Sequence, residues 1–286
     1  YTKALVERYK DVVDEWEIWN EPFHQAQEYA EMVYETAKAV HEVQPGAKCY
    51  CTAISMREDM TKSDHAVVLE KLKKENALGL VNRFIYHPYA ENPDTSYEAG
   101  KGQFGWQMAL PLRRLVKSYS PDYDIMQGEV GCPSQLEYAH AMCNNEWTEY
   151  SQAKWLLRRT VGDAVRSIPS SVFTMIDLKY TFMLQSYGLV RSNLLKEFVY
   201  RRPSYYAMSH VFNLLDDDAK PLGVETALAA LNRAVWAVKC ELGDGSDIVE
   251  EFEKVRARIV RYFNGEIHRT VLSNGDIIEV KYIKKA

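Results

Sequence analysis

Along residues 1–217 the chain switches repeatedly between two patterns of apolar residues. Short, mostly apolar runs are each followed by longer runs in which apolar residues recur at helical spacing. The first pattern predicts β-strands and the second predicts amphipathic helices. The predicted strands are 15–21, 48–54, 81–87, 123–129 and 171–177, and the predicted helices are 25–44, 61–76, 106–119, 147–167 and 203–216. This alternation predicts an α/β fold with a parallel sheet.

Beyond residue 217 the chain changes to short alternating runs. The dipeptides Asn264–Gly265 and Asn274–Gly275 interrupt these runs, and Asn-Gly is a strong signal for a two-residue hairpin turn. We therefore expect two domains. The first is an α/β domain over 1–217, and the second is a small antiparallel β-domain over 218–286.

Polar residues at the ends of the predicted strands favour a closed barrel. Asn20 and Glu21 end the first strand, His87 ends the third with Tyr89 just after it, and Glu129 ends the fourth. Functional residues at the C-terminal ends of several strands are typical of a TIM barrel. An open doubly wound sheet places its site at the same edge, but usually with a glycine-rich phosphate loop, which this sequence lacks. The sequence thus predicts a (β/α)8 TIM barrel.

Strand periodicity also predicts which side chains share a face. Side chains two residues apart point the same way, so Glu17, Trp19 and Glu21 are expected on the inner face. Arg83 precedes His87 by four residues, as Glu17 precedes Glu21. We predict that Glu17 and Arg83 form a buried ion pair, because an unpaired charge inside a barrel would be very costly.

Glu21 and Glu129 are the candidate catalytic residues. If both face the interior, their carboxylates meet at the barrel mouth, with His87 and Tyr89 between them. Glycoside hydrolysis needs such a pair, since one carboxyl gives a proton to the leaving oxygen while the other attacks the anomeric carbon or activates water. The alternative for either glutamate alone is an acid that caps the helix after its strand.

The segments around these glutamates resemble the retaining glycoside hydrolases of clan A, such as families 5 and 39. "WNEPF" at 19–23, "HPY" at 87–89 and "QGEVG" at 127–131 occur in the order of that group's strands 4, 6 and 7. "GLV" at 188–190 and "YRRPSYYAM" at 200–208 resemble the stretch that opens its last barrel helix. The resemblance covers about residues 1–217. It implies that the chain starts near strand 4 and that a preceding part of the full-length protein supplies strands 1 to 3.

The resemblance implies a role for each of these residues. Glu21 would be the general acid/base and Glu129 the nucleophile of a glycosyl-enzyme mechanism. Asn20 would hydrogen-bond the sugar 2-hydroxyl, while Tyr89 and His87 would orient Glu129 or touch the sugar.

Strand 8 departs from the pattern of the group. Many members place a tryptophan there as the floor of the sugar subsite, and 171–177 contains none. The expected substitutes in substrate binding are Trp19, Trp106, Trp147, Asp177 and Tyr180. A structural salt bridge is an equal alternative for Asp177.

Composition agrees with a sugar-binding cleft without identifying the sugar. The chain of 286 residues has 19 Tyr and 6 Trp and a net charge of -5. Aromatic side chains suit stacking on hydroxylated rings, although they also fill cores. The weak negative charge gives no case for nucleic acid or an anionic membrane, and no apolar run is long enough for a transmembrane helix.

The expected function is hydrolysis of β-glycosidic bonds in a carbohydrate substrate. Two carboxylates and water suffice for this reaction, so no cofactor is expected. The 5 cysteines show no zinc-ligand spacing, so no metal is expected either. Three alternatives stay open: a transglycosylase with the same carboxylates, a non-catalytic carbohydrate-binding barrel, and a structural subunit whose barrel is completed by a partner. A secreted or periplasmic location follows only by analogy with polysaccharide-degrading enzymes.

Overall fold

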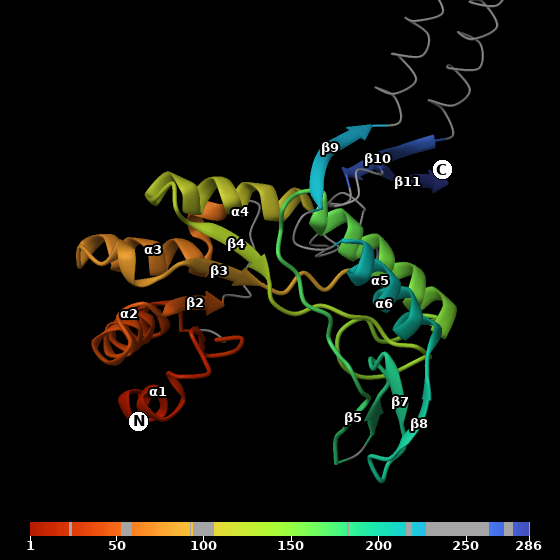
Figure 1. The fold of residues 1–286 in the computed structure, drawn as a ribbon, viewed down its shortest axis with the longest axis horizontal. Helices are drawn as coiled ribbons and strands as arrows, with labels where there is room; N and C mark the ends of the chain where they lie inside the picture. Colours follow the sequence, from red (N-terminus) through yellow and green to blue (C-terminus); the bar gives the residue numbers. More distant parts are fainter. Residues whose placement is uncertain are drawn as a thin grey trace, which may run out of the picture. The chain divides into compact units, whose positions relative to one another are not determined.

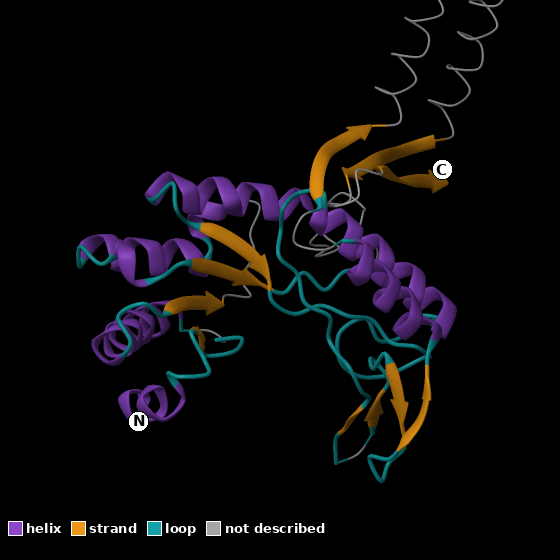
Figure 2. Ribbon diagram, in the orientation of Figure 1, coloured by secondary structure: helices purple, strands orange, loops and turns teal. Residues whose placement is uncertain are grey.

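The computed structural model describes residues 1–22, 25–52, 59–91, 93, 106–181, 183–215, 219–226, 263–271 and 277–285 (Figures 1 and 2). The chain forms two compact units. The first comprises Tyr1–Leu156 and Ile168–Ser204, and the second comprises Leu157–Ser167 and Tyr205–Ala286. The expected domain boundary between residues 217 and 218 stays a prediction.

The first unit is built on a parallel sheet of four strands. These strands are β1 (Glu15–Ile18), β2 (Lys48–Thr52), β3 (Arg83–Tyr86) and β4 (Asp124–Gln127), and they lie in the order β1-β2-β3-β4. All three neighbouring pairs are parallel, as the alternating pattern predicts. Cys51, Phe84 and Ile125 are fully buried, as expected for strands that are covered on both faces.

Helices pack along the strands as the sequence pattern predicts. They are α1 (Thr2–Tyr9), α2 (Ala26–Val43), α3 (Asp64–Lys74) and α4 (Trp106–Tyr119), with 3-10 turns at Met60–Lys62 and Leu78–Leu80. In Figure 1, α2, α3 and α4 lie along the sheet in the same spatial order as β2, β3 and β4. The buried residues Tyr29, Val33, Ala37 and Val40 recur three or four positions apart along α2, which is the spacing of a helix with one apolar face.

The segment predicted as the strand 171–177 runs beside β4 but is irregular. A parallel bridge joins Gln127 to Ser170, and the Phe173 amide donates to the Val130 carbonyl at 2.9 Å. Gly131 lies where the two segments meet, because a Cβ on it would fall 1.7 Å from the Phe173 carbonyl oxygen. The fold described is therefore mixed α/β with a four-stranded parallel sheet, and the closed barrel stays a prediction.

Two short hairpins that the pattern did not predict follow this segment. One joins β5 (Leu178–Lys179) to β6 (Leu184–Gln185), and the other joins β7 (Val190–Ser192) to β8 (Phe198–Arg201). Their strands are only two to four residues long, which is too short to show a clear alternation of apolar and polar residues.

Helices α5 (Glu149–Ala164) and α6 (Pro203–Leu214) divide between the two units. The second unit also contains an antiparallel sheet of β9 (Lys220–Thr226), β10 (Phe263–Val271) and β11 (Ile277–Lys285) in the order β11-β10-β9. The expected antiparallel sheet after residue 217 is thus present.

One of the two predicted turns in this sheet is wrong. Asn264 and Gly265 lie within β10 and pair with Lys284 and Ile283, because ladder partners on the neighbouring strand override the local turn preference of Asn-Gly. Asn274–Gly275 and the alternating run 229–244 lie outside the described residues. Within the described part of the chain, no helix combines the length and the apolar character that a membrane span requires.

Candidate active site

The first strand of the sheet ends in an unusual backbone turn. β1 stops at Ile18, and Trp19 and Glu21 have φ values of 64° and 48°, in the left-handed region that non-glycine residues rarely adopt. Such conformations cost about 1–3 kcal/mol each and persist where the surrounding structure holds them. The turn explains why the strand is shorter than predicted, and Glu21 within it contacts His87, which directly follows β3.

A tyrosine from α2 holds the end of β1 in place. The hydroxyl of Tyr29 donates to the Ile18 carbonyl at 2.8 Å and accepts from the Thr52 amide at 2.9 Å. Tyr29 therefore connects the ends of β1 and β2. It also lines a cavity of about 350 Å³ beside the turn, whose other lining residues are Trp19, Glu21, Pro22, Gln25, Glu28 and Met32.

His87 contacts Glu21. The Nδ1 atom of His87 lies 2.8 Å from Oε1 of Glu21. The His87 side chain is 2% exposed and the Glu21 side chain is 28% exposed. The imidazole is therefore held inside the protein, while the carboxylate can be reached from outside.

Tyr89 contacts Glu129. Its hydroxyl donates to Oε1 of Glu129 at 2.7 Å. Burial raises the pKa of Tyr89 well above its usual value, and the negative charge of Glu129 raises it further. The phenol is thus a permanent donor to one carboxylate oxygen and does not contact the other through this hydrogen bond. The resemblance implied that both His87 and Tyr89 orient Glu129 or touch the sugar, whereas the structure places one beside each glutamate.

These contacts bring the two glutamates together. One ligating atom from each of Glu21, His87 and Glu129 lies within 4.8 Å of the others, so a Glu21 carboxylate oxygen is at most that far from one of Glu129. Carboxyl groups stand about 5–5.5 Å apart in retaining glycosidases and about 6.5–9.5 Å apart in inverting ones. The closest oxygens of Glu21 and Glu129 are therefore nearer to the spacing of retaining enzymes than to that of inverting ones. Glu21, His87 and Glu129 are also residues of the kind that binds metal ions.

Two aromatic residues that the sequence analysis did not single out pack behind Tyr89. The ring of Tyr187 lies edge-on to that of Tyr89, with centroids 6.5 Å apart, and the ring of Phe173 lies 6.1 Å from that of Tyr187. Phe173 is the one aromatic residue in the predicted strand 171–177.

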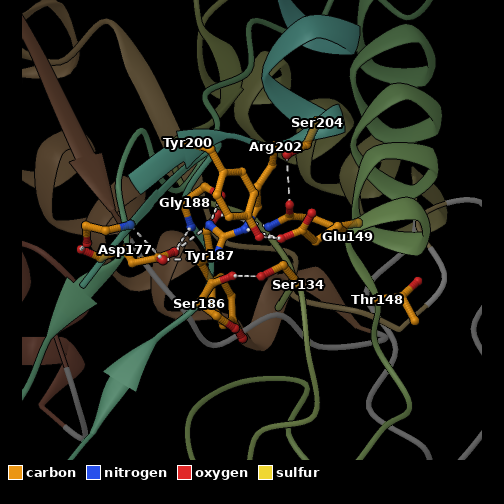
Figure 3. Close-up of polar contacts among 12 residues, drawn as sticks. Ser134, Thr148, Glu149, Asp177, Ser186, Tyr187, Gly188, Tyr200, Arg202 and Ser204 are labelled. Carbon is orange, nitrogen blue, oxygen red and sulfur yellow. Dashed lines mark hydrogen bonds and ion pairs between the residues drawn. The ribbon is translucent and has the colours of Figure 1, made fainter. Parts of the chain in front are cut away.

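Asp177 is part of a buried ion pair (Figure 3). The two guanidinium nitrogens of Arg202 lie 2.7 and 2.9 Å from its two carboxylate oxygens. The same oxygens accept from the backbone amides of Gly188 at 3.0 Å and Ser192 at 3.2 Å. Asp177 is 3% exposed. The structure thus has the salt bridge that was the alternative for this residue, and its expected role in substrate binding stays a prediction.

The other candidate residues are spread more widely. Asn20 and Trp19 are exposed, Trp19 by 64%. The indole nitrogen of Trp147 donates to the Met142 carbonyl at 2.9 Å, and Tyr180 packs near His140 with ring centroids 4.7 Å apart. Trp106 begins α4, and its side chain lies outside the described residues.

The predicted ion pair between Glu17 and Arg83 is wrong. Glu17 is exposed and accepts a hydrogen bond from the hydroxyl of Thr52 on β2. Arg83 instead lies over the ring of Tyr50, with its guanidinium carbon 5.6 Å from the ring centroid. β2 lies between β1 and β3, so residues of β2 satisfy both side chains before they could meet across it.

Comparison with known proteins finds a similar fold among solved structures. No protein-family model and no curated protein matches the sequence. The structure is similar to a GH2 β-galacturonidase from Eisenbergiella tayi, with a TM-score of 0.51 and 13% identity over 74% of this chain. It is also similar to an FMN-binding β-glucuronidase from Facaelibacterium prausnitzii L2-6, with a TM-score of 0.51 and 13% identity over 98% of this chain. The matches cover 35% and 39% of those two enzymes, so the chain spans well under half their length.

Proposed function

We propose that the chain forms part of a retaining β-glycosidase with a TIM-barrel catalytic domain. The observation that carries this proposal is the approach of Glu21 and Glu129 to within 4.8 Å from the ends of β1 and β4. The similarity in fold to glycoside hydrolases supports the same class of reaction. The β-linkage is proposed by analogy with those enzymes.

In the first step, Glu129 attacks the anomeric carbon and forms a glycosyl-enzyme ester. The bond from that carbon to the glycosidic oxygen breaks, and Glu21 gives its proton to this oxygen, which leaves as an alcohol. In the second step, Glu21 removes a proton from water, the water oxygen attacks the anomeric carbon, and Glu129 is released as a carboxylate. Two displacements at one carbon retain its configuration.

The neighbouring groups support these two roles. The hydrogen bond from Tyr89 fixes the orientation of Glu129 and leaves Oε2 for attack. His87 holds Glu21 from the buried side, so the free carboxylate oxygen is directed toward the leaving group. Asn20, next to Glu21 at the exposed turn, is proposed to bind the sugar 2-hydroxyl.

The test is hydrolysis of aryl β-glycosides by the complete protein. Glu129→Gln should abolish turnover. Glu21→Gln should slow it by about 10²–10⁴-fold, the usual contribution of a general acid/base, with a smaller loss on substrates whose leaving group needs no proton. Glu146→Gln, at an exposed acid of the loop before α5, is the matched control and should keep full activity.

The product distinguishes the mechanism from its alternatives. Proton NMR of the sugar product as it first forms identifies its anomeric configuration. A retaining enzyme should leave this configuration unchanged, and an inverted product would refute the retaining mechanism. Longer sugar products would identify a transglycosylase. Sugar binding without turnover in the unaltered protein would point to a non-catalytic barrel.

A further inference from the structure

Glu21, His87 and Glu129 form a chelating set as well as a carboxylate pair. Each offers one ligand atom, and these atoms lie within 4.8 Å of one another. Among the described residues, they form the one group of three or more His, Cys, Asp or Glu side chains with this geometry. We propose that the set binds a divalent transition-metal ion, with Zn²⁺ as the representative case, and that the bound ion blocks the proposed active site.

The donor set suits this class of ion. Zn²⁺ binds imidazole nitrogen at about 2.0–2.1 Å and carboxylate oxygen at about 2.0–2.2 Å, and open sites combine three protein ligands with a water molecule. At those bond lengths, tetrahedral ligand atoms stand roughly 3.3 Å apart. Nδ1 of His87 and Oε1 of Glu21 are 2.8 Å apart, so they need to separate only slightly. Mg²⁺ and Ca²⁺ prefer oxygen ligands alone, and the imidazole therefore favours a transition metal.

The surroundings of the three groups also fit a chelate. His87 directly follows β3 and its side chain is buried, so packing in the protein interior holds the imidazole. Tyr89 holds only Oε1 of Glu129, which leaves the second oxygen for an ion. The Glu21 side chain is 28% exposed, which gives the ion a path from solvent.

Charge favours occupation by a divalent cation. Two carboxylates brought this close repel each other when both are ionised, and an ion of charge +2 between them removes the repulsion. The ion would occupy the space between the carboxylates that the glycosidic oxygen and anomeric carbon need. Binding itself follows from the geometry alone, whereas inhibition rests on the proposed function.

The experiment is a titration of the complete protein with ZnCl₂, followed by isothermal calorimetry, and with CoCl₂, followed by visible absorption. One ion per chain should bind in the unaltered protein. His87→Gln and Glu129→Gln should each weaken this binding at least tenfold, with circular dichroism to confirm that each variant is folded. His210→Gln is the control, because His210 is an exposed histidine on α6 in the other unit, and it should leave the affinity unchanged.

A further variant tests whether weaker metal binding comes from loss of a ligand or from a general loss of structure around the site. Tyr89→Phe keeps all three ligands and frees Oε1 of Glu129, so it should bind the ion at least as tightly as the unaltered protein. Equal Zn²⁺ affinity in His87→Gln and the unaltered protein would overturn the proposal, as would no binding at millimolar Zn²⁺. If the metal-free protein binds the ion but has no glycosidase activity, the metal site stands, and the proposed function is refuted together with the inhibition that rests on it.

Discussion

Replacing Asp177 by asparagine tests whether the buried ion pair with Arg202 is structural. Both side chains are fully buried, and the two groups make two hydrogen bonds of 2.7 and 2.9 Å. Asparagine has nearly the same shape but no charge. Its amide group, a donor, would replace one of the two oxygens that accept from Arg202 and from the backbone amides of Gly188 and Ser192.

The expected loss is large because the remaining charge stays buried. Removing one partner of a buried ion pair costs about 3–5 kcal/mol of unfolding free energy. For a domain of this size, each kcal/mol lowers the melting temperature by about 2–4 °C, so Asp177→Asn should melt about 6–20 °C lower. Urea unfolding, followed by circular dichroism, measures the free energy directly.

Two further variants isolate the pair. Glu149 also lies near Arg202, at 3.3 Å, but its side chain is 29% exposed, so Glu149→Gln should cost about 1 kcal/mol or less. The double variant Asp177→Leu with Arg202→Met should be more stable than Asp177→Asn, because it leaves no unpaired buried charge. A stability of Asp177→Asn within about 1 kcal/mol of the unaltered protein, together with a raised KM, would refute the structural role and support a role of Asp177 in substrate binding.

Three more predictions concern the site and its supports. Tyr89→Phe removes a hydrogen bond to the charged Glu129, worth about 1.5–3 kcal/mol, so in steady-state assays kcat should fall roughly 10- to 150-fold with little change in KM; an unchanged kcat would contradict this. Burial lowers the pKa of His65 to about 4, below that of the unfolded chain, so stability should be full above about pH 6.5 and fall by on the order of 3 kcal/mol toward pH 4. Urea unfolding at several pH values should show this slope, and His65→Gln should flatten it. Gly131→Ala should cost about 3 kcal/mol or more, because its Cβ would overlap a backbone carbonyl oxygen, while Gly79→Ala, with open space around it, should change urea stability by less than about 0.5 kcal/mol.

Sequence periodicity predicted the parallel sheet because that sheet is buried on both faces. The runs around Cys51, Phe84 and Ile125 are apolar enough to identify their strands. Periodicity did not predict where the first strand ends, because the left-handed turn at Trp19 and Glu21 is held by tertiary contacts such as the Tyr29 hydroxyl. Side-chain parity therefore failed beyond Ile18.

Partners at long range explain the other differences. Arg202 lies 25 residues from Asp177 in the sequence, and no local pattern indicates that the two are paired. Glu17 and Arg83 could be aligned by counting along their strands. Counting could not show that residues of the intervening strand satisfy both. The sequence is most informative about contacts within one element, and least about which polar side chain reaches which partner.

The stretch "QGEVG" shows how the fold and the candidate site depend on the same residues. A Cβ on Gly128 would lie 2.3 Å from a side-chain carbon of Ile85 on β3, and one on Gly131 would lie 1.7 Å from the Phe173 carbonyl oxygen on the other side. Both glycines are therefore required for the chain to pass between its two neighbours. Glu129 lies between the glycines, so the close packing that demands them also fixes its backbone. Because Tyr89 then fixes its carboxylate, the position of Glu129 is set by packing against both neighbouring segments, and a change at either glycine should displace it even when the glutamate is intact.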